Sequence, residues 1–220
     1  MKKIILSLVL LLFGTSSFAQ KKFSEATISY TIAIEGLPED DPSAEMLKDA
    51  TMKMVYKGDD VKMDMDMIMM KNIILMNAQT KKYTLLLDLM GQKFAIAMSE
   101  EEMNKSKEDA EKVKSVTKTS DSKKIAGYLC FKYVVIKING DETVVWATTE
   151  IEPQAKNPND MYAGKLEGFP LEYTNLTNGM SMKMQATAVN FDKVAASEYE
   201  IPTDYVPTNM EELSKKMGGN

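Results

Sequence analysis

Apolar and polar residues alternate at every second position along most of the chain. In Ser24–Glu35, the apolar residues Ile28, Tyr30, Ile32 and Ile34 are separated by Ser, Thr and Ala. Successive side chains of a strand point to opposite faces, so this period of two predicts a half-buried strand. The same kind of segment recurs at Met52–Lys57, Val61–Met70, Ile73–Met76, Tyr83–Leu89, Lys93–Met98, Val113–Thr119, Tyr128–Ile138, Thr143–Thr149, Phe169–Thr177, Met180–Val189 and Tyr199–Ile201.

Short turn signals separate these segments. Gly58-Asp59-Asp60, Asn139-Gly140 and Asn178-Gly179 are typical of tight hairpin connections. Hairpins join neighbouring strands in antiparallel order, whereas parallel sheets need helical crossovers between strands. The sequence therefore predicts a mainly β protein with an antiparallel sheet.

A few segments predict short helices at the periphery of the sheet. Ser99 with Glu102, and Thr208 with Glu211, have the spacing of a capping box, in which each side chain bonds the other residue's backbone N–H. Asp41 is placed to cap a third helix, with Pro42 at its first position. The predicted helices cover 42–50, 99–112 and 208–217.

The most unusual strand is Val61–Met70, which reads VKMDMDMIMM. Methionine occupies every second position, so one face of this strand carries only thioethers. Asp64 and Asp66 point the other way, and we expect them on the solvated face. The same spacing returns in Met52-Lys53-Met54 and Met180-Ser181-Met182-Lys183-Met184, and we expect all three segments to share one face of the sheet.

The first residues predict export from the cytoplasm. Lys2 and Lys3 precede the apolar run Ile4–Phe13, and small residues follow up to Ala19. This is the pattern of a secretory signal peptide, and the run is too short for a helix of about 20 residues that would span a bilayer. We therefore expect residues 1–19 to be removed and 20–220 to form a single soluble domain, periplasmic or extracellular.

Composition excludes several classes of function. The chain has no histidine and no arginine, and 32 acidic residues exceed 27 lysines. Nucleic-acid binding needs clustered positive charge, so we expect none. Without imidazole, and without a P-loop, dinucleotide or G-x-S-x-G motif, we expect neither an enzyme nor a cofactor, and no histidine metal site. The single cysteine, Cys130, is interpreted as a buried thiol, with a reactive or interchain thiol as the alternative.

Three segments carry a resemblance to a known family: Ile125–Val135 (IAGYLCFKYVV), Val145–Thr148 (VWAT) and Gly168–Leu171 (GFPL). With them, the chain resembles a family of exported bacterial proteins of unknown function, which is remotely similar to the lipoprotein carriers LolA and LolB. The resemblance implies a curved antiparallel sheet, wrapped as a half-barrel around an apolar cavity with helices beside it. The chain lacks the arginines that such carriers use for polar contacts.

The methionine faces leave several functions open. The first hypothesis is a non-catalytic binding protein for an apolar ligand, or for an envelope lipid or lipoprotein component, because flexible thioethers repack around ligands of different shape. A soft-metal site for Cu(I) or Ag(I) is the second, since thioethers suit these ions, and a structural or assembly partner in the envelope is the third. Adaptable core packing, without any ligand, is the simplest alternative.

The binding hypothesis names its residues and one loop. The irregular stretch Pro153–Gly168 is long enough to cover or border a cavity. The candidate ligand-binding residues are Met63, Met65, Met67, Met69, Met180, Met182, Met184 and Trp146.

Overall fold

The computed structural model describes residues 20–36, 49–68, 70–105, 112–155, 161–162, 164–177 and 180–216. The predicted signal peptide, the predicted turn Asn178-Gly179 and all but the end of the predicted helix 42–50 lie outside these residues. Within the described ranges, α-helix is confined to α2 (Glu100–Lys105) and α3 (Met210–Lys216). Ser99 and Glu102 form the predicted capping box of α2. The predicted box Thr208–Glu211 is wrong by one residue, because Asn209 caps α3 by accepting from the backbone N–H of Glu212.

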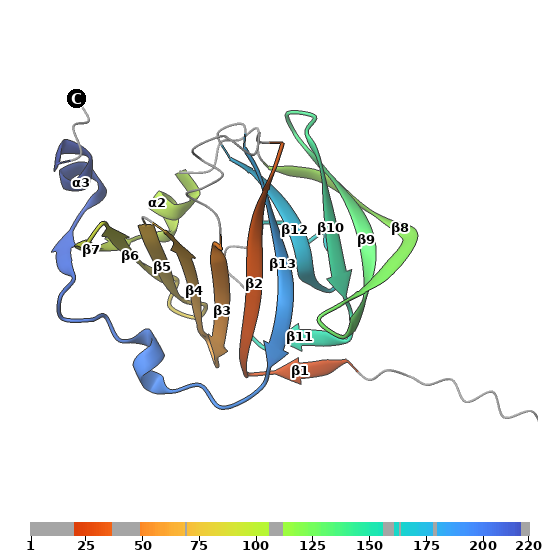
Figure 1. The fold of residues 1–220 in the computed structure, drawn as a ribbon, viewed down its shortest axis with the longest axis horizontal. Coiled ribbons are helices and arrows are strands. Elements are labelled where there is room, and N and C mark those ends of the chain that lie inside the picture. The colour runs from red at the N-terminus through yellow and green to blue at the C-terminus, as the bar shows by residue number, and fades with distance from the viewer. Residues whose placement is uncertain are drawn as a thin grey trace, which may run out of the picture.

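One curved, open sheet of twelve strands dominates the molecule (Figure 1). The fold class predicted from the sequence is thereby confirmed. From one edge to the other, the strands are β14 (Val206–Thr208), β7 (Gln92–Met98), β6 (Lys82–Leu89), β5 (Met70–Asn77), β4 (Asp60–Met67), β3 (Thr51–Lys57), β2 (Glu25–Glu35), β13 (Met180–Asn190), β12 (Phe169–Thr177), β10 (Glu142–Thr148), β9 (Tyr128–Lys137) and β8 (Val113–Ile125).

The order of the strands follows from the local hairpins. β3 to β7 form one meander, β8 to β10 form another, and all their pairings are antiparallel. The long strands β2 and β13 join the two halves in the middle of the sheet. Parallel pairing occurs where β14 adds to β7, and in a separate two-stranded sheet of β1 (Lys21–Phe23) and β11 (Ile151–Pro153).

Two strand predictions are wrong. The segment Val61–Met70 is not one strand, because β4 ends at Met67 and β5 begins opposite it at Met70. Lys71 and Asn72, which separate the predicted strands Val61–Met70 and Ile73–Met76, therefore lie inside β5. The alternation continues through the hairpin without Gly, Asn or Pro, so the pattern gave no sign of the reversal. The predicted strand Tyr199–Ile201 is replaced by a short 3-10 helix, η2 (Ala196–Tyr199).

The main core lies on one face of the sheet and is contiguous across both halves. Met52 lies directly opposite Met65, and Met54 opposite Met63, on the paired strands β3 and β4. Met184 of β13 belongs to the same buried cluster. The described Met-x-Met residues therefore share one face of the sheet, as the sequence predicts.

The other face of β4–β7 is crossed by the segment from Val194 to β14 (Figure 1). Tyr205 from this segment packs against a small apolar cluster that contains Ile73, Leu86 and Ala95. Lys93 Nζ lies 2.6 Å from a carboxylate oxygen of Asp204. The C-terminal segment thus covers apolar side chains that would otherwise face water.

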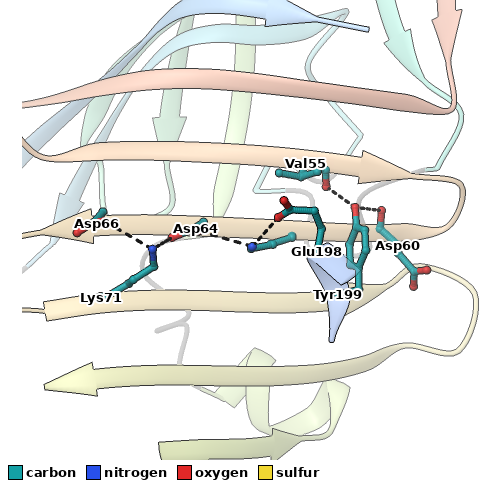
Figure 2. Close-up of polar contacts among 8 residues, drawn as sticks. Val55, Asp60, Asp64, Asp66, Lys71, Glu198 and Tyr199 are labelled. Atoms are coloured by element: carbon teal, nitrogen blue, oxygen red, sulfur yellow. Dashed lines mark hydrogen bonds and ion pairs between the residues drawn. The ribbon is translucent and has the colours of Figure 1, made fainter. Parts of the chain in front are cut away.

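Polar contacts fix this segment onto β3 and β4, as Figure 2 shows. The hydroxyl of Tyr199 donates to the backbone oxygens of Val55 at 3.0 Å and Asp60 at 3.3 Å. Lys62 Nζ lies 2.9 Å from the carboxylate of Glu198. These contacts join sequence positions more than a hundred residues apart.

The outward carboxylates of β4 differ from one another. Asp66 is 59% exposed, which agrees with the predicted solvated face. The side chain of Asp64 is only 15% exposed, so the prediction is wrong for this residue. Lysines on both sides explain its burial: Lys62 and Lys71 lie 3.6 and 3.3 Å from its carboxylate oxygens. A carboxylate withdrawn from water needs such partners.

Candidate functional site

The core face of the sheet contains a hollow of about 520 Å³. A volume of this size lies within the range of small-molecule sites, roughly 300–1,000 Å³. Its wall comes from β2, β3 and β12, and residues 151–153, 161–162, 164, 166 and 168 border it. The lining residues are Gln20, Tyr30, Met54, Tyr56, Ile151, Glu152, Pro153, Met161, Tyr162, Gly164, Leu166, Gly168, Phe169, Pro170 and Tyr173.

Aromatic rings from separate strands pack edge to face around this hollow. The ring centroids of Tyr56 and Phe169 are 6.1 Å apart, and those of Tyr30 and Tyr173 are also 6.1 Å apart. Phe23 of β1 contacts Tyr56 with a centroid distance of 5.4 Å. Such edge-to-face contacts hold large side chains in fixed positions, so the wall is rigid on this side.

The tyrosine hydroxyls give this apolar wall a few polar points. Tyr30 donates a hydrogen bond to the backbone oxygen of Pro170 at 3.2 Å, and the hydroxyl of Tyr173 lies 3.9 Å from the sulfur of Met52. Burial raises the pKa of Tyr30, Tyr56 and Tyr173 above the ordinary value of 10.0. These phenols are therefore neutral at physiological pH and act as dipoles rather than charges.

Of the loop Pro153–Gly168, the described residues Pro153, Met161, Tyr162, Gly164, Leu166 and Gly168 border the hollow, as predicted for this loop. Gly168 brings it close to the sheet: a Cβ at this position would lie 2.5 Å from the backbone oxygen of Thr148. Its φ of +96° is also one that other residues rarely adopt. This glycine is therefore required where the loop returns to β12.

The predicted methionine site lies beside the hollow rather than around it. Met63, Met65, Met67 and Met182 are half-buried and pack on the core, and Met184 is fully buried. The methionines among the lining residues are Met54 and Met161, and neither is one of the predicted ligand-binding residues. Met69, and the side chain of Met180, lie outside the part of the chain that the structure describes.

Trp146 lies on the opposite face of the sheet from the methionines. Its neighbour Val145 pairs with Tyr173 on the core face, whereas Trp146 pairs with Lys132 on one side and Glu172 on the other. Because strand residues alternate between faces, Trp146 faces away from the apolar hollow. The structure therefore divides the predicted ligand-binding residues between two surfaces.

The tyrosines that line the hollow are not among the residues predicted from the sequence. Tyr30, Tyr56 and Tyr173 each occupy an inward position of an alternating strand, so the period of two assigns all three to a buried face. Periodicity does not tell which strands become neighbours. β13 forms a local hairpin with β12, but it also pairs with β2 across a long sequence separation, and this second pairing brings Tyr30 next to Tyr173.

Cys130 is completely buried, which confirms the interpretation of a buried thiol. Burial, reinforced by the nearby Glu150 carboxylate, raises the pKa of the Cys130 thiol to about 11. Since the thiolate is the nucleophilic form, the thiol is unreactive at neutral pH.

Within the ranges that the structure covers, no three His, Cys, Asp or Glu side chains gather in a way that suits a metal ion. None of the described helices is both long and apolar enough to cross a bilayer.

A family model, described as "Domain of unknown function (DUF4412)", matches residues 42–205. The chain belongs to the DUF4412 family. This confirms the predicted membership of a family of unknown function. A search of curated proteins found no match to the sequence.

Three solved structures resemble this DUF4412 chain. PNGF-II, solved in space group C2, has a TM-score of 0.47 at 15% identity, and the alignment covers 87% of this chain and 32% of PNGF-II. MucB has a TM-score of 0.39 at 8% identity, covering 82% of this chain and 58% of MucB. The Pseudomonas aeruginosa MucA/MucB complex gives 0.40 at 9%, covering 82% and 56%. This chain thus spans about a third of PNGF-II and over half of MucB.

Proposed function

We propose that the protein is an exported, non-catalytic binding protein that holds an apolar ligand in the aromatic hollow. The observation that carries the proposal is the hollow itself, a space of about 520 Å³ on the core face with apolar and aromatic walls. Small-molecule sites are concave, mostly apolar and open to solvent on one side, and this hollow has that form. Neutral phenols at its wall suit a ligand with one polar group.

The volume selects among the apolar ligands. At roughly 30 Å³ for each water-sized group, the hollow holds about 17 non-hydrogen atoms. That is the size of one acyl chain or one small fused-ring molecule. The several acyl chains of a lipoprotein exceed it, so we propose a single-chain amphiphile rather than a whole lipoprotein anchor.

The methionine strand has a defined place in this proposal. Met54 lines the hollow, and Met63 lies directly beside Met54 on the neighbouring strand β4. Met65 and Met67 continue the same half-buried row. Unbranched thioethers repack at low cost, so this row forms the flank that adapts to longer or bulkier ligands.

Ligand binding is tested with cis-parinaric acid, a fatty acid whose fluorescence rises in apolar surroundings. We expect the chain without residues 1–19 to bind it, and palmitate to displace it. Leu166 lines the hollow and is half-buried, so Leu166→Trp fills space without removing a core side chain. We expect this variant to bind the probe at least ~10-fold more weakly, a loss of about 1.4 kcal/mol.

The matched control is Ile68→Trp, which adds the same ring at a 63% exposed position. This variant should bind the probe as the unmodified chain does. Equal binding by all three proteins, or no fluorescence change with any of them, would reject the apolar site.

A soft-metal site is favoured by one observation. The pairs Met52–Met65 and Met54–Met63 lie directly opposite each other, so four thioethers meet on one face. Replacing Met63, Met65 and Met67 together by Leu keeps the face apolar but removes three sulfurs. The metal site is supported if the unmodified chain binds Ag(I) saturably, the triple variant does not, and the unmodified chain gives no response to fatty acid.

Export is part of the same proposal. The basic residues, the apolar run and the small residues before Ala19 support cleavage after that residue. Mass spectrometry of the protein from its native envelope should give a chain that begins at Gln20. A structural or assembly role in the envelope stays a prediction, which co-purification of a protein partner without ligand would favour.

A further inference from the structure

A second hollow, of about 500 Å³, lies on the opposite face of the sheet. Its floor and walls come from β9, β10, β12 and β13, and polar groups dominate it. The lining residues are Lys132, Asp141, Glu142, Thr143, Val144, Trp146, Glu172, Thr174, Ser181 and Lys183. The proposed apolar ligand therefore has no place there.

The centre of this hollow is a buried carboxylate. Glu172 is 5% exposed, although its position on β12 faces away from the main core. Lys123 Nζ donates to both of its carboxylate oxygens at 2.7 and 2.8 Å, and Lys183 Nζ lies 3.5 Å from one of them. Buried ion pairs of this kind add little net stability, because desolvation offsets the attraction. They do hold an acceptor in a fixed position.

The curvature of the sheet makes this arrangement possible. Lys123 belongs to β8, which is separated from β12 by β9 and β10. In a flat sheet, three strand spacings would place β8 about 14 Å from β12. The direct contact between Lys123 and Glu172 shows that the edge of the sheet curls over this face, which creates the concavity.

Trp146 is the only tryptophan of the chain and forms part of the lining. The ammonium of Lys123 lies 4.3 Å from its ring centroid, which fixes the indole beside Glu172. Within the described residues, the indole N–H and the hydroxyl of Thr174 have no hydrogen-bond partner. Hydrogen-bond donors without a partner thus lie near the Glu172 carboxylate, whose position is fixed by Lys123.

We propose that this second hollow binds a neutral saccharide of one or two rings. A sugar offers many hydroxyl groups that donate and accept, together with apolar ring faces that pack on an aromatic side chain. The hollow supplies both kinds of contact, and its volume corresponds to about 17 non-hydrogen atoms. Charge argues against an anion, because Glu172, Asp141 and Glu142 stand among the lysines.

The test uses Trp146 as its own reporter, since its fluorescence originates in this hollow alone. The chain without residues 1–19 is titrated with N-acetylglucosamine, chitobiose, maltose and cellobiose. We expect a saturable change in emission with at least one of these sugars. Each sugar is added up to about 50 mM, which is 50-fold above a Kd of ~1 mM. No change in emission with any of the four sugars would overturn the proposal.

Variants locate the binding site. Thr174→Val removes an unpaired hydroxyl at nearly constant volume, and we expect affinity to fall about 5- to 10-fold. Glu172→Gln should weaken binding by more than ~10-fold, with its fold checked by circular dichroism. The matched control Thr84→Val lies on the outward face of β6, far from the hollow, and should bind as the unmodified chain does.

Two further outcomes are decisive. A response to phosphate or acetate that exceeds the response to every sugar would assign the hollow to anions and overturn the proposal. Leu166→Trp fills the apolar hollow, so it should weaken cis-parinaric acid binding but leave the sugar response intact, measured by calorimetry. Loss of both ligands in this variant would contradict two separate sites.

Discussion

Gly168→Ala is expected to lower the free energy of unfolding by about 2–4 kcal/mol. The φ of +96° costs an alanine about 1 kcal/mol, and the new Cβ would meet the backbone oxygen of Thr148 at 2.5 Å. Backbone atoms cannot rotate away as a side chain does, so overpacking adds about 1–3 kcal/mol. Chemical denaturation measured by circular dichroism gives the difference between the two proteins.

Gly140→Ala is the matched control for this prediction. Gly140 has a nearly equal φ of +93°, but a Cβ there would meet no atom within 4 Å. We expect this variant to lose only the conformational cost of about 1 kcal/mol. Equal losses in the two variants would show that the close approach of the loop to β10 is not a constraint.

Alkaline pH is expected to unfold the protein steeply. Burial raises the pKa of Tyr30, Tyr56 and Tyr173, which are 3%, 4% and 8% exposed. Above pH 10 the unfolded chain releases these three protons and the folded chain keeps them, so stability falls as pH rises. Three protons correspond to about 4 kcal/mol per pH unit. Below pH 10 these residues give no pH dependence.

The measurement is the free energy of unfolding between pH 9 and pH 12, with tyrosinate absorbance followed in parallel. Tyr56→Phe removes one of the three protons, and no described group accepts a hydrogen bond from this hydroxyl. We expect its slope to become shallower by about 1.4 kcal/mol per pH unit. An unchanged slope would mean that Tyr56 ionises equally in both states.

Much of the fold follows from local pattern. The alternation in Ser24–Glu35 and Tyr83–Leu89 places strands β2 and β6 correctly, because the period of two belongs to each strand by itself. The capping box at Ser99 locates the start of α2, whereas the pair predicted for α3 lies one residue before its actual cap, Asn209. The reversal between Met67 and Met70 was not predicted, since the residues between them, Ile68 and Met69, are not turn-forming residues.

The candidate site was predicted less well than the fold. The methionines of β4 were predicted as ligand-binding residues because methionine at every second position is unusual. The aromatic residues Tyr56 and Phe169 line the hollow instead. Trp146 was grouped with the methionines, although register places it on the other face. Composition shows which residues are rare, whereas a site is defined by which residues meet.

The sequence by itself determined the class of fold and the buried face of the strands. It also determined that no function can depend on histidine, which the chain lacks. These properties depend on residue type and on spacing along the chain. Only the tertiary structure decided that Tyr30 meets Tyr173, and that Lys123 reaches Glu172. Both contacts depend on which distant strands pair and how far the sheet curls, and these are collective results of packing that no local pattern encodes.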